Sequence, residues 1–209
     1  REAVHYTAGP LLVLAGAGSG KTRVITEKIV HLIETCDIKP HQIAAITFTN
    51  KAAKEMRTRL ERLMGYSAQS MWVGTFHGLA HRILRQYYIE AGLGDNFQII
   101  DSEDQFRLIK RLVKELNLDE TECDPKRAQG FINRQKDEGR RYQDLKPATT
   151  QEIACFMEVY RCYEAHCVRT HLVDFAELLL KIYELFITRS DILKIFQDRF
   201  KHILVDEFQ

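Results

Sequence analysis

The chain has 209 residues, 45% of them hydrophobic, and a formal net charge of +1. This size and composition indicate a globular protein, and the small net charge excludes the overall basicity that signals nucleic-acid binding. We expect no membrane span, because no apolar run is long enough to cross a bilayer, and no secretory signal is visible. The cysteines are odd in number and include no Cys-x-x-Cys pair, which predicts idle or buried thiols in a reducing cytosol. They are Cys36, Cys123, Cys155, Cys162 and Cys167.

The first predicted element is a strand at 11–14, followed by a glycine-rich turn and a helix over 23–33. Such a turn points backbone N–H groups and the positive end of the helix dipole at an anion. Glycines curl around phosphate without a Cβ, the lysine supplies charge for the β- and γ-phosphates, and the threonine supplies a hydroxyl for Mg²⁺. The pattern predicts a nucleoside-triphosphate site made of Ala15, Gly16, Ala17, Gly18, Ser19, Gly20, Lys21 and Thr22. Ala15 replaces the usual glycine and requires a negative φ.

The next strands are predicted at 43–48 and 71–74, and each leads into a helix. At the first junction Phe48 offers a surface for a base, while Thr49 and Asn50 offer hydrogen bonds to phosphate. The segment 74–82 repeats this design. For each junction alone, the alternative is a buried aromatic residue followed by an ordinary helix cap. The basic runs at 51–62 and 126–141 are typical of solvated helix faces.

Between about 86 and 200 the pattern is almost entirely helical, with one strand candidate at 97–100. Capping boxes predict helix starts at Ser102, Thr149 and Asp174. A helical subdomain is therefore expected to interrupt the α/β domain. Two groups of possible metal ligands do not fit a zinc site. The spacing of Cys162, His166, Cys167 and His171 matches no standard site, and the i,i+4 pair His77 and His81 lacks the glutamate of a His-Glu-x-x-His arrangement.

The last predicted strand, 203–205, ends in two adjacent carboxylates. The ends of strands are where open parallel sheets bind ligands. We expect Asp206 to hold Mg²⁺ together with Thr22, and Glu207 to orient or deprotonate the attacking water. Combined with the loop at Lys21, this pair favours a nucleoside triphosphatase over a kinase.

Several segments then carry a resemblance to a known family: AGAGSGKTR, ITFTNKAAKEMR, GTFHGLAHRILR, VDFAELLL and ILVDEFQ. In this order and at these separations they closely resemble the UvrD/PcrA/Rep group of superfamily 1 DNA helicases, and most nearly its UvrD branch. The resemblance covers essentially the whole chain. It implies part of a RecA-like P-loop domain with a parallel sheet (1A, residues 1–85 and 201–209) and a mainly helical insert (1B, residues 86–200).

The resemblance also implies an activity. The parent protein would be a 3′-to-5′ helicase of DNA repair that uses ATP and Mg²⁺ in the cytoplasm, associated with the nucleoid. Its partners would be single-stranded DNA, junctions of single and double strands, and repair proteins, with no membrane. The implied catalytic residues are Lys21, Asp206, Glu207 as base and Gln209 as sensor of the γ-phosphate. Arg23 would stack on adenine, and the DNA strand would contact Phe48, Thr49, Asn50, Lys51, Thr75 and His77.

Two departures from the family pattern lower the activity that we expect of this chain. The glutamine that reads adenine would immediately precede Arg1, and the second RecA-like domain with its arginine fingers is missing. Both ends look cut, so we expect an inactive part of a longer enzyme. The alternatives are a subunit of a recombination helicase-nuclease and a nucleotide- or DNA-binding module without turnover. A P-loop transporter ATPase or a small-molecule kinase would lack the segments at 46–56 and 74–82.

Overall fold

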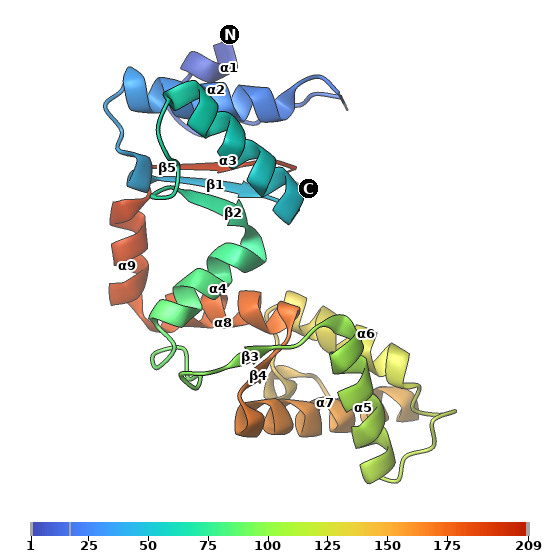
Figure 1. Cartoon of the computed structure of the whole chain (residues 1–209). Helices are drawn as coiled ribbons and strands as arrows, with labels where there is room; N and C mark the ends of the chain where they lie inside the picture. The colour runs from blue at the N-terminus through green and yellow to red at the C-terminus, as the bar shows by residue number, and fades with distance from the viewer. Residues whose placement is uncertain (1, 17, 208–209) are drawn as a thin grey trace. The chain divides into compact units, whose positions relative to one another are not determined.

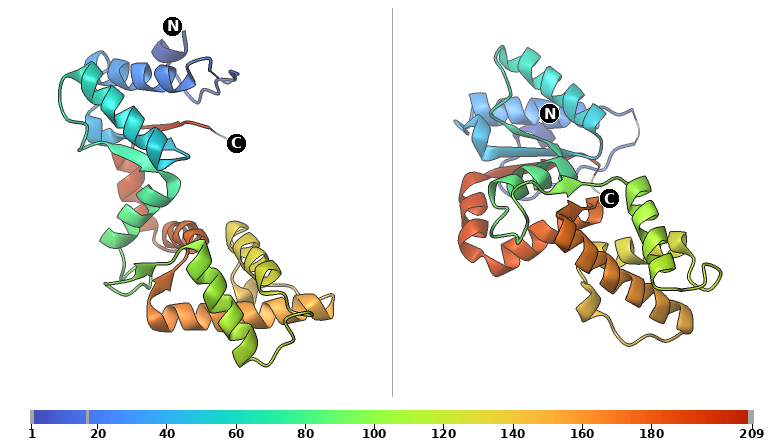
Figure 2. Two further views of the ribbon diagram at one scale, coloured as in Figure 1. Left: turned by 45° about the vertical axis from the view of Figure 1, so that its right-hand side comes forward. Right: turned by 60° about the horizontal axis from the view of Figure 1, so that its bottom comes forward.

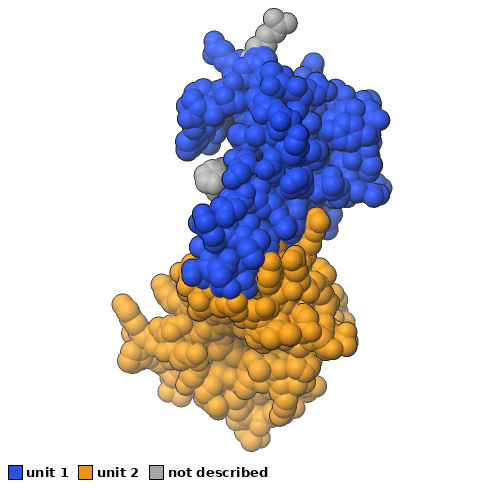
Figure 3. All heavy atoms as spheres, turned by 90° about the vertical axis from the view of Figure 1, so that its left-hand side faces the viewer, with its two compact units in different colours: residues 1–79, 190–209 blue, residues 80–189 orange. Residues whose placement is uncertain are grey.

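The computed structural model describes residues 2–16 and 18–207. The chain divides into two compact units, which Figure 3 colours separately: unit 1 comprises residues 1–79 and 190–209, and unit 2 comprises residues 80–189. No helix in the described ranges is both long and apolar enough to span a bilayer. The assignment of subdomains 1A and 1B stays a prediction.

A three-stranded sheet lies at the centre of unit 1 (Figure 1), in the order β2-β1-β5. Its strands are β1 (Ile43–Thr47), β2 (Trp72–Thr75) and β5 (His202–Val205). Both pairings are parallel, with Thr47 opposite Thr75 and Ile46 opposite Val205. The parallel α/β sheet is therefore confirmed, and all three strands end at the same edge.

The two faces of this sheet are covered by different helices. Helices α2 (Lys21–Glu34) and α3 (Asn50–Met64) lie side by side on one face, as Figures 1 and 2 show. There Val73 belongs to the same core as Ile29 of α2 and Met56 of α3. Because successive strand residues point to opposite faces, Trp72 packs instead edge-on against Phe196 of α9 (Ser190–Arg199). Smaller elements complete the unit: α1 (Glu2–His5), η1 (Pro40–Gln42) and the start of α4 (Phe76–Gln86).

The prediction of a strand at 11–14 is wrong. The structure has no strand there, and the four side chains are between 42% and 87% exposed. A strand requires a neighbour that accepts its backbone hydrogen bonds. Within the described ranges the sheet ends at β5, and this apolar run is not paired with it.

Unit 2 is mainly helical. Its helices are α5 (Ser102–Glu115), α6 (Pro125–Asp137), α7 (Gln151–Thr170) and α8 (Phe175–Thr188), with the short turn η2 (Tyr142–Asp144). Residues from α5, α6 and α7 form its core, among them Ile109, Ile132 and Tyr160. A short parallel ladder joins β3 (Gln98–Ile99) to β4 (Leu172–Val173). β3 lies inside the predicted strand 97–100, whereas β4 is too short to show a sequence pattern.

The capping boxes locate the helix starts to within one residue. Asp174 caps α8 as predicted, and its Oδ1 accepts from the Glu177 N–H at 2.8 Å. The other caps are Asp101 and Thr150, each one residue from the expected Ser102 and Thr149. In both cases neighbouring residues can cap, and the local backbone decides between them.

The prediction that all five cysteines are buried or idle thiols is wrong for two of them. Cys123 and Cys155 form a disulfide that joins positions 32 residues apart, with a Cα–Cα distance of 6.0 Å. The remaining three cysteines, Cys36, Cys162 and Cys167, are free. Sequence spacing could not reveal this pair, because the fold of unit 2 brings the segment before α6 beside α7.

Candidate functional site

The glycine-rich loop of unit 1 leads directly into helix α2. Gly18 and Gly20 have positive φ values of 75° and 86°, which side chains with a Cβ rarely adopt. Gly20 is the N-cap of α2 and provides no side-chain hydrogen bond to the first turn. The N–H groups at the start of the helix therefore lack a side-chain cap, as an anion site requires. Ala15 is not among the described residues with positive φ, so it fits its place in the loop.

Lys21 folds back over this loop. Its ammonium group donates to the carbonyl oxygens of Ala15 at 3.0 Å and Gly16 at 3.3 Å. Ser19 also donates to Gly16 O, at 2.7 Å, and tightens the turn. A cationic group is thus held beside the free helix terminus, where it could pair with the β- and γ-phosphates of a nucleotide.

The next residue, Thr22, reaches across the sequence to Asp206. Thr22 Oγ1 donates to Asp206 Oδ2 at 3.1 Å, although the residues are 184 positions apart. Asp206 is only 7% exposed, and its N–H continues the ladder by donating to Ile46 O at 2.8 Å. A hydroxyl and a carboxylate therefore meet beside the helix terminus, and these are the oxygen ligands that Mg²⁺ prefers. The residues present fit a magnesium nucleotide.

Glu207 differs from its neighbour in exposure and backbone. It is exposed, while Asp206 is buried, and its φ is 57°, in the left-handed region. A residue other than glycine in this region stores backbone strain, which clusters at functional sites. The buried carboxylate of Asp206 is thus suited to bind a metal, and the exposed carboxylate of Glu207 is suited to bind a water molecule.

The remaining predicted nucleotide contacts are less defined. Arg23 is exposed and forms an ion pair with Glu27 at 3.2 Å on the surface of α2. Ala17 and Gln209 lie outside the described residues, so their predicted roles rest on the sequence alone.

The junction between β1 and α3 presents the first group of predicted DNA contacts. Phe48 is 78% exposed, so the alternative of a buried aromatic residue is wrong here. Thr49 is the N-cap of α3, and its Oγ1 accepts from the Ala52 N–H at 3.1 Å. Asn50 and Lys51 follow in the first turn, and both are exposed. The junction thus offers an open aromatic ring beside a helix N-terminus.

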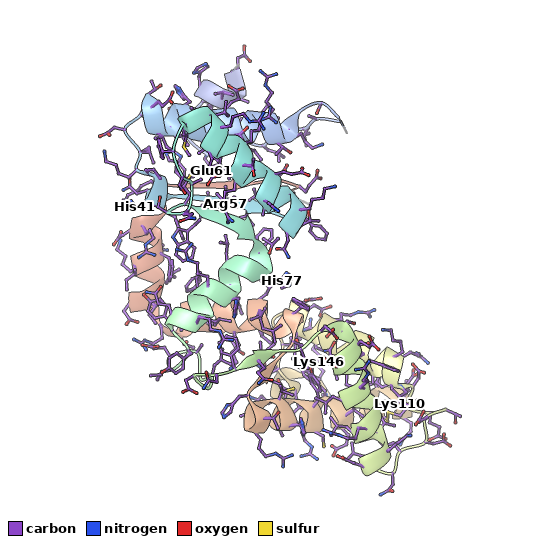
Figure 4. All side chains as sticks on the ribbon, viewed as in Figure 1. His41, Arg57, Glu61, His77, Lys110 and Lys146 are labelled. Atoms are coloured by element: carbon purple, nitrogen blue, oxygen red, sulfur yellow. A yellow bond between two sulfur atoms is a disulfide. The ribbon has the colours of Figure 1, made fainter. Side chains whose placement is uncertain are left out.

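The junction between β2 and α4 lies at the neighbouring strand end. Thr75 is nearly buried, and its Oγ1 accepts from the Gly78 N–H at 3.1 Å. His77 lies in the first turn of α4 (Figure 4) and is partly exposed. Since Thr75 is opposite Thr47 in the sheet, both junctions leave the sheet side by side.

Phe76 is a further residue of this junction that the sequence pattern did not single out. It is 43% exposed and follows Thr75 just as Phe48 follows Thr47. The signal was the Thr-Phe pair that ends both strands. The structure therefore brings two groups to one edge of a single sheet: the nucleotide group at β5 and the aromatic group at β1 and β2.

The chain is similar to known proteins over its whole length. The UvrD/REP helicase N-terminal domain matches residues 1–209. DNA helicase II of Escherichia coli (strain K12) is 52% identical over 209 residues, and ATP-dependent DNA helicase PcrA of Leuconostoc citreum is 44% identical over 210 residues. Both alignments cover 100% of this chain, which spans 29% and 28% of the respective relatives. The predicted resemblance is confirmed, and the chain belongs to the UvrD/REP helicase family.

Proposed function

We propose that this chain is the N-terminal part of an ATP-dependent DNA helicase that moves 3′ to 5′ along a single strand in DNA repair. The observation that carries the proposal is the contact between Thr22 and Asp206 at the sheet edge that also presents Phe48 and Phe76. The names of the relatives, DNA helicase II and ATP-dependent DNA helicase PcrA, support it. The parent enzyme would act in the cytoplasm, at the nucleoid, on junctions of single and double strands with repair proteins.

In this proposal the loop and α2 bind the nucleotide. The backbone from Ala15 to Gly20 surrounds the phosphates, Lys21 pairs with them, and Arg23 lies against adenine. Thr22 and Asp206 hold Mg²⁺, which would neutralise charge that develops on the phosphates. Glu207 orients the attacking water, and Gln209 responds to the γ-phosphate.

The neighbouring junctions bind one strand of DNA. Phe48 stacks on a base, while Thr49, Asn50 and Lys51 bind the phosphate backbone. Thr75 and His77 continue the path at the next strand end. Because adjacent strands lie about 4.8 Å apart, Phe76 is placed to meet a following base.

Lys21→Ala is expected to abolish the weak binding of ATP and Mg²⁺ by the 209-residue chain. Charge-assisted bonds to phosphate are the strong contacts at this site, and Lys21 supplies the ammonium group beside the loop. Isothermal titration at millimolar ATP measures the loss. Lys54→Ala removes an exposed lysine from α3 and serves as the control. Tight ATP binding that survives Lys21→Ala would contradict the assignment.

Phe48→Ala is expected to weaken binding of single-stranded DNA by about 1–3 kcal/mol, the usual contribution of one stacked base. Binding itself should be weak, salt-sensitive and independent of sequence. Because Phe48 is exposed, the melting temperature should not change. Fluorescence anisotropy with labelled oligothymidine measures the affinity. The control is Tyr66→Ala, which removes another exposed aromatic ring of unit 1; an equal loss in both variants would argue against a specific stacking site.

A further inference from the structure

Arg57 makes an unusual contact within unit 1. It lies on α3 (Figure 4), and its Nη2 donates to the backbone carbonyl of Val73, on β2, at 2.7 Å. Arg57 makes no ion pair within the ranges that the structure describes. Although Arg57 is an exposed residue, its guanidinium group is directed at a neutral backbone group of the neighbouring strand.

The two ends of this hydrogen bond belong to the two proposed DNA-binding junctions. Arg57 is on the helix whose first turn carries Asn50 and Lys51. Val73 is on the short strand that ends at Thr75, directly before Phe76. The bond thus joins the element that follows Phe48 to the element that precedes Phe76.

The sheet alone does not fix the spacing of the two junctions. Strand register places Thr47 beside Thr75, but the direction of α3 across the sheet depends on its side chains. Ala53, Met56 and Leu60 provide apolar contacts, which permit sliding more readily than a hydrogen bond of defined geometry. A planar guanidinium with fixed donors holds its acceptor in one direction.

We propose that Arg57 is a positioning residue of the single-strand site. Its bond to Val73 O holds the start of α3 and the end of β2 at the spacing that lets Phe48 and Phe76 meet successive bases. Arg57 itself does not contact the nucleic acid. This inference rests on the proposed binding of single-stranded DNA at these junctions.

The test compares Arg57→Met with Arg62→Met in anisotropy titrations of oligothymidine over a series of salt concentrations. Methionine keeps an apolar stem and removes every donor, and Arg62 is an exposed arginine of the same helix, so both variants lose the same charge. We expect Arg57→Met to weaken binding about tenfold beyond Arg62→Met, with the same dependence of affinity on salt in both variants. A direct phosphate contact would instead lower the salt slope of Arg57→Met by about one.

A second readout examines the aromatic pair. In the Arg57→Met background, the loss caused by Phe48→Ala should shrink, because the ring is already misplaced and the two changes are not additive. Arg57→Lys, which retains one donor and the charge, is expected to recover most of the affinity. If Arg57→Met unfolds the protein, as circular dichroism would show, Arg57→Gln is compared with Arg62→Gln instead, because the shorter neutral amide cannot replace the guanidinium group, and the same non-additivity with Phe48→Ala is expected.

The outcomes separate this inference from the proposed function. If the unmodified chain binds no single-stranded DNA, the proposed function itself fails. If it binds and Arg57→Met behaves like Arg62→Met, the DNA-binding function stands and the positioning role is overturned. A lowered salt slope, or a full additive loss from Phe48→Ala in the Arg57→Met background, overturns the positioning role as well.

Discussion

Lys136→Met is expected to cost unit 2 about 3–5 kcal/mol of unfolding free energy, the usual effect of removing one partner of a buried ion pair. Lys136 Nζ lies 2.6 Å from Asp174 Oδ2 and 2.8 Å from Glu177 Oε2. The side chains of Lys136 and Asp174 are only 2% and 3% exposed. Methionine would leave Asp174 as a buried charge without its cation, whereas Glu177 would keep Arg141 at 2.7 Å.

Urea denaturation followed by circular dichroism measures this loss. Lys110→Met removes a half-exposed lysine that lies 3.9 Å from Glu120, and its effect should stay below about 1 kcal/mol. The double variant Lys136→Met/Asp174→Asn should be more stable than Lys136→Met, because asparagine removes the orphan charge and still caps α8. If the double variant is no more stable than Lys136→Met, the loss comes from packing and not from the unpaired charge of Asp174.

The same network gives the loss a pH dependence. Burial alone would raise the pKa of Glu177, but Lys136 and Arg141 outweigh it and hold that pKa at about 2. Glu177 therefore contributes stability above its ordinary pKa that is lost as the pH falls toward 2. Burial alone would lower the pKa of Lys136, yet Glu177 and Asp174 raise it, so its contribution persists through neutral pH and is lost only in strong alkali. The cost of Lys136→Met should accordingly shrink as the pH falls toward 2, where Glu177 becomes neutral.

Two local features of the structure accord with what the sequence pattern leads one to expect. The proposed phosphate loop requires glycines with positive φ, and Gly18 and Gly20 have them. The pairing of Thr22 with Asp206 followed from the chemistry of a metal site, even across the inserted unit. Exposure of Phe48 was left open, because an aromatic residue after a strand is compatible with either a buried or an open position.

Features set by tertiary contacts could not be predicted. The run at 11–14 is as apolar as a strand, but sequence does not say which neighbour accepts its hydrogen bonds. The disulfide between Cys123 and Cys155 and the bond from Arg57 to Val73 O join elements that only the fold brings together. An arginine in a basic helix face and a cysteine in a scattered set look the same whether or not they have such partners.

The second large effect is expected on ATP turnover. The 209-residue chain should release phosphate from ATP only at the background rate, with or without DNA, and should not unwind duplex DNA. Catalysis of phosphoryl transfer depends on positioning and on charge stabilisation, and a missing arginine finger costs about 10³–10⁵ in rate. The described residues near the loop include two cationic side chains, Lys21 and Arg23. Arg23 already pairs with Glu27.

A longer chain that includes the second RecA-like domain implied by the resemblance should hydrolyse ATP with DNA stimulation and unwind duplex DNA. Glu207→Gln should abolish both activities while ATP binding persists, because the amide cannot take the proton of the attacking water and Lys21 still binds the phosphates. Glu34→Gln makes the same change at an exposed carboxylate of α2 and should have no effect. A phosphate-release assay on both chains decides the point. If the 209-residue chain shows DNA-stimulated turnover that disappears in Glu207→Gln, one RecA-like domain suffices for catalysis, and the arginines of a second domain are not required.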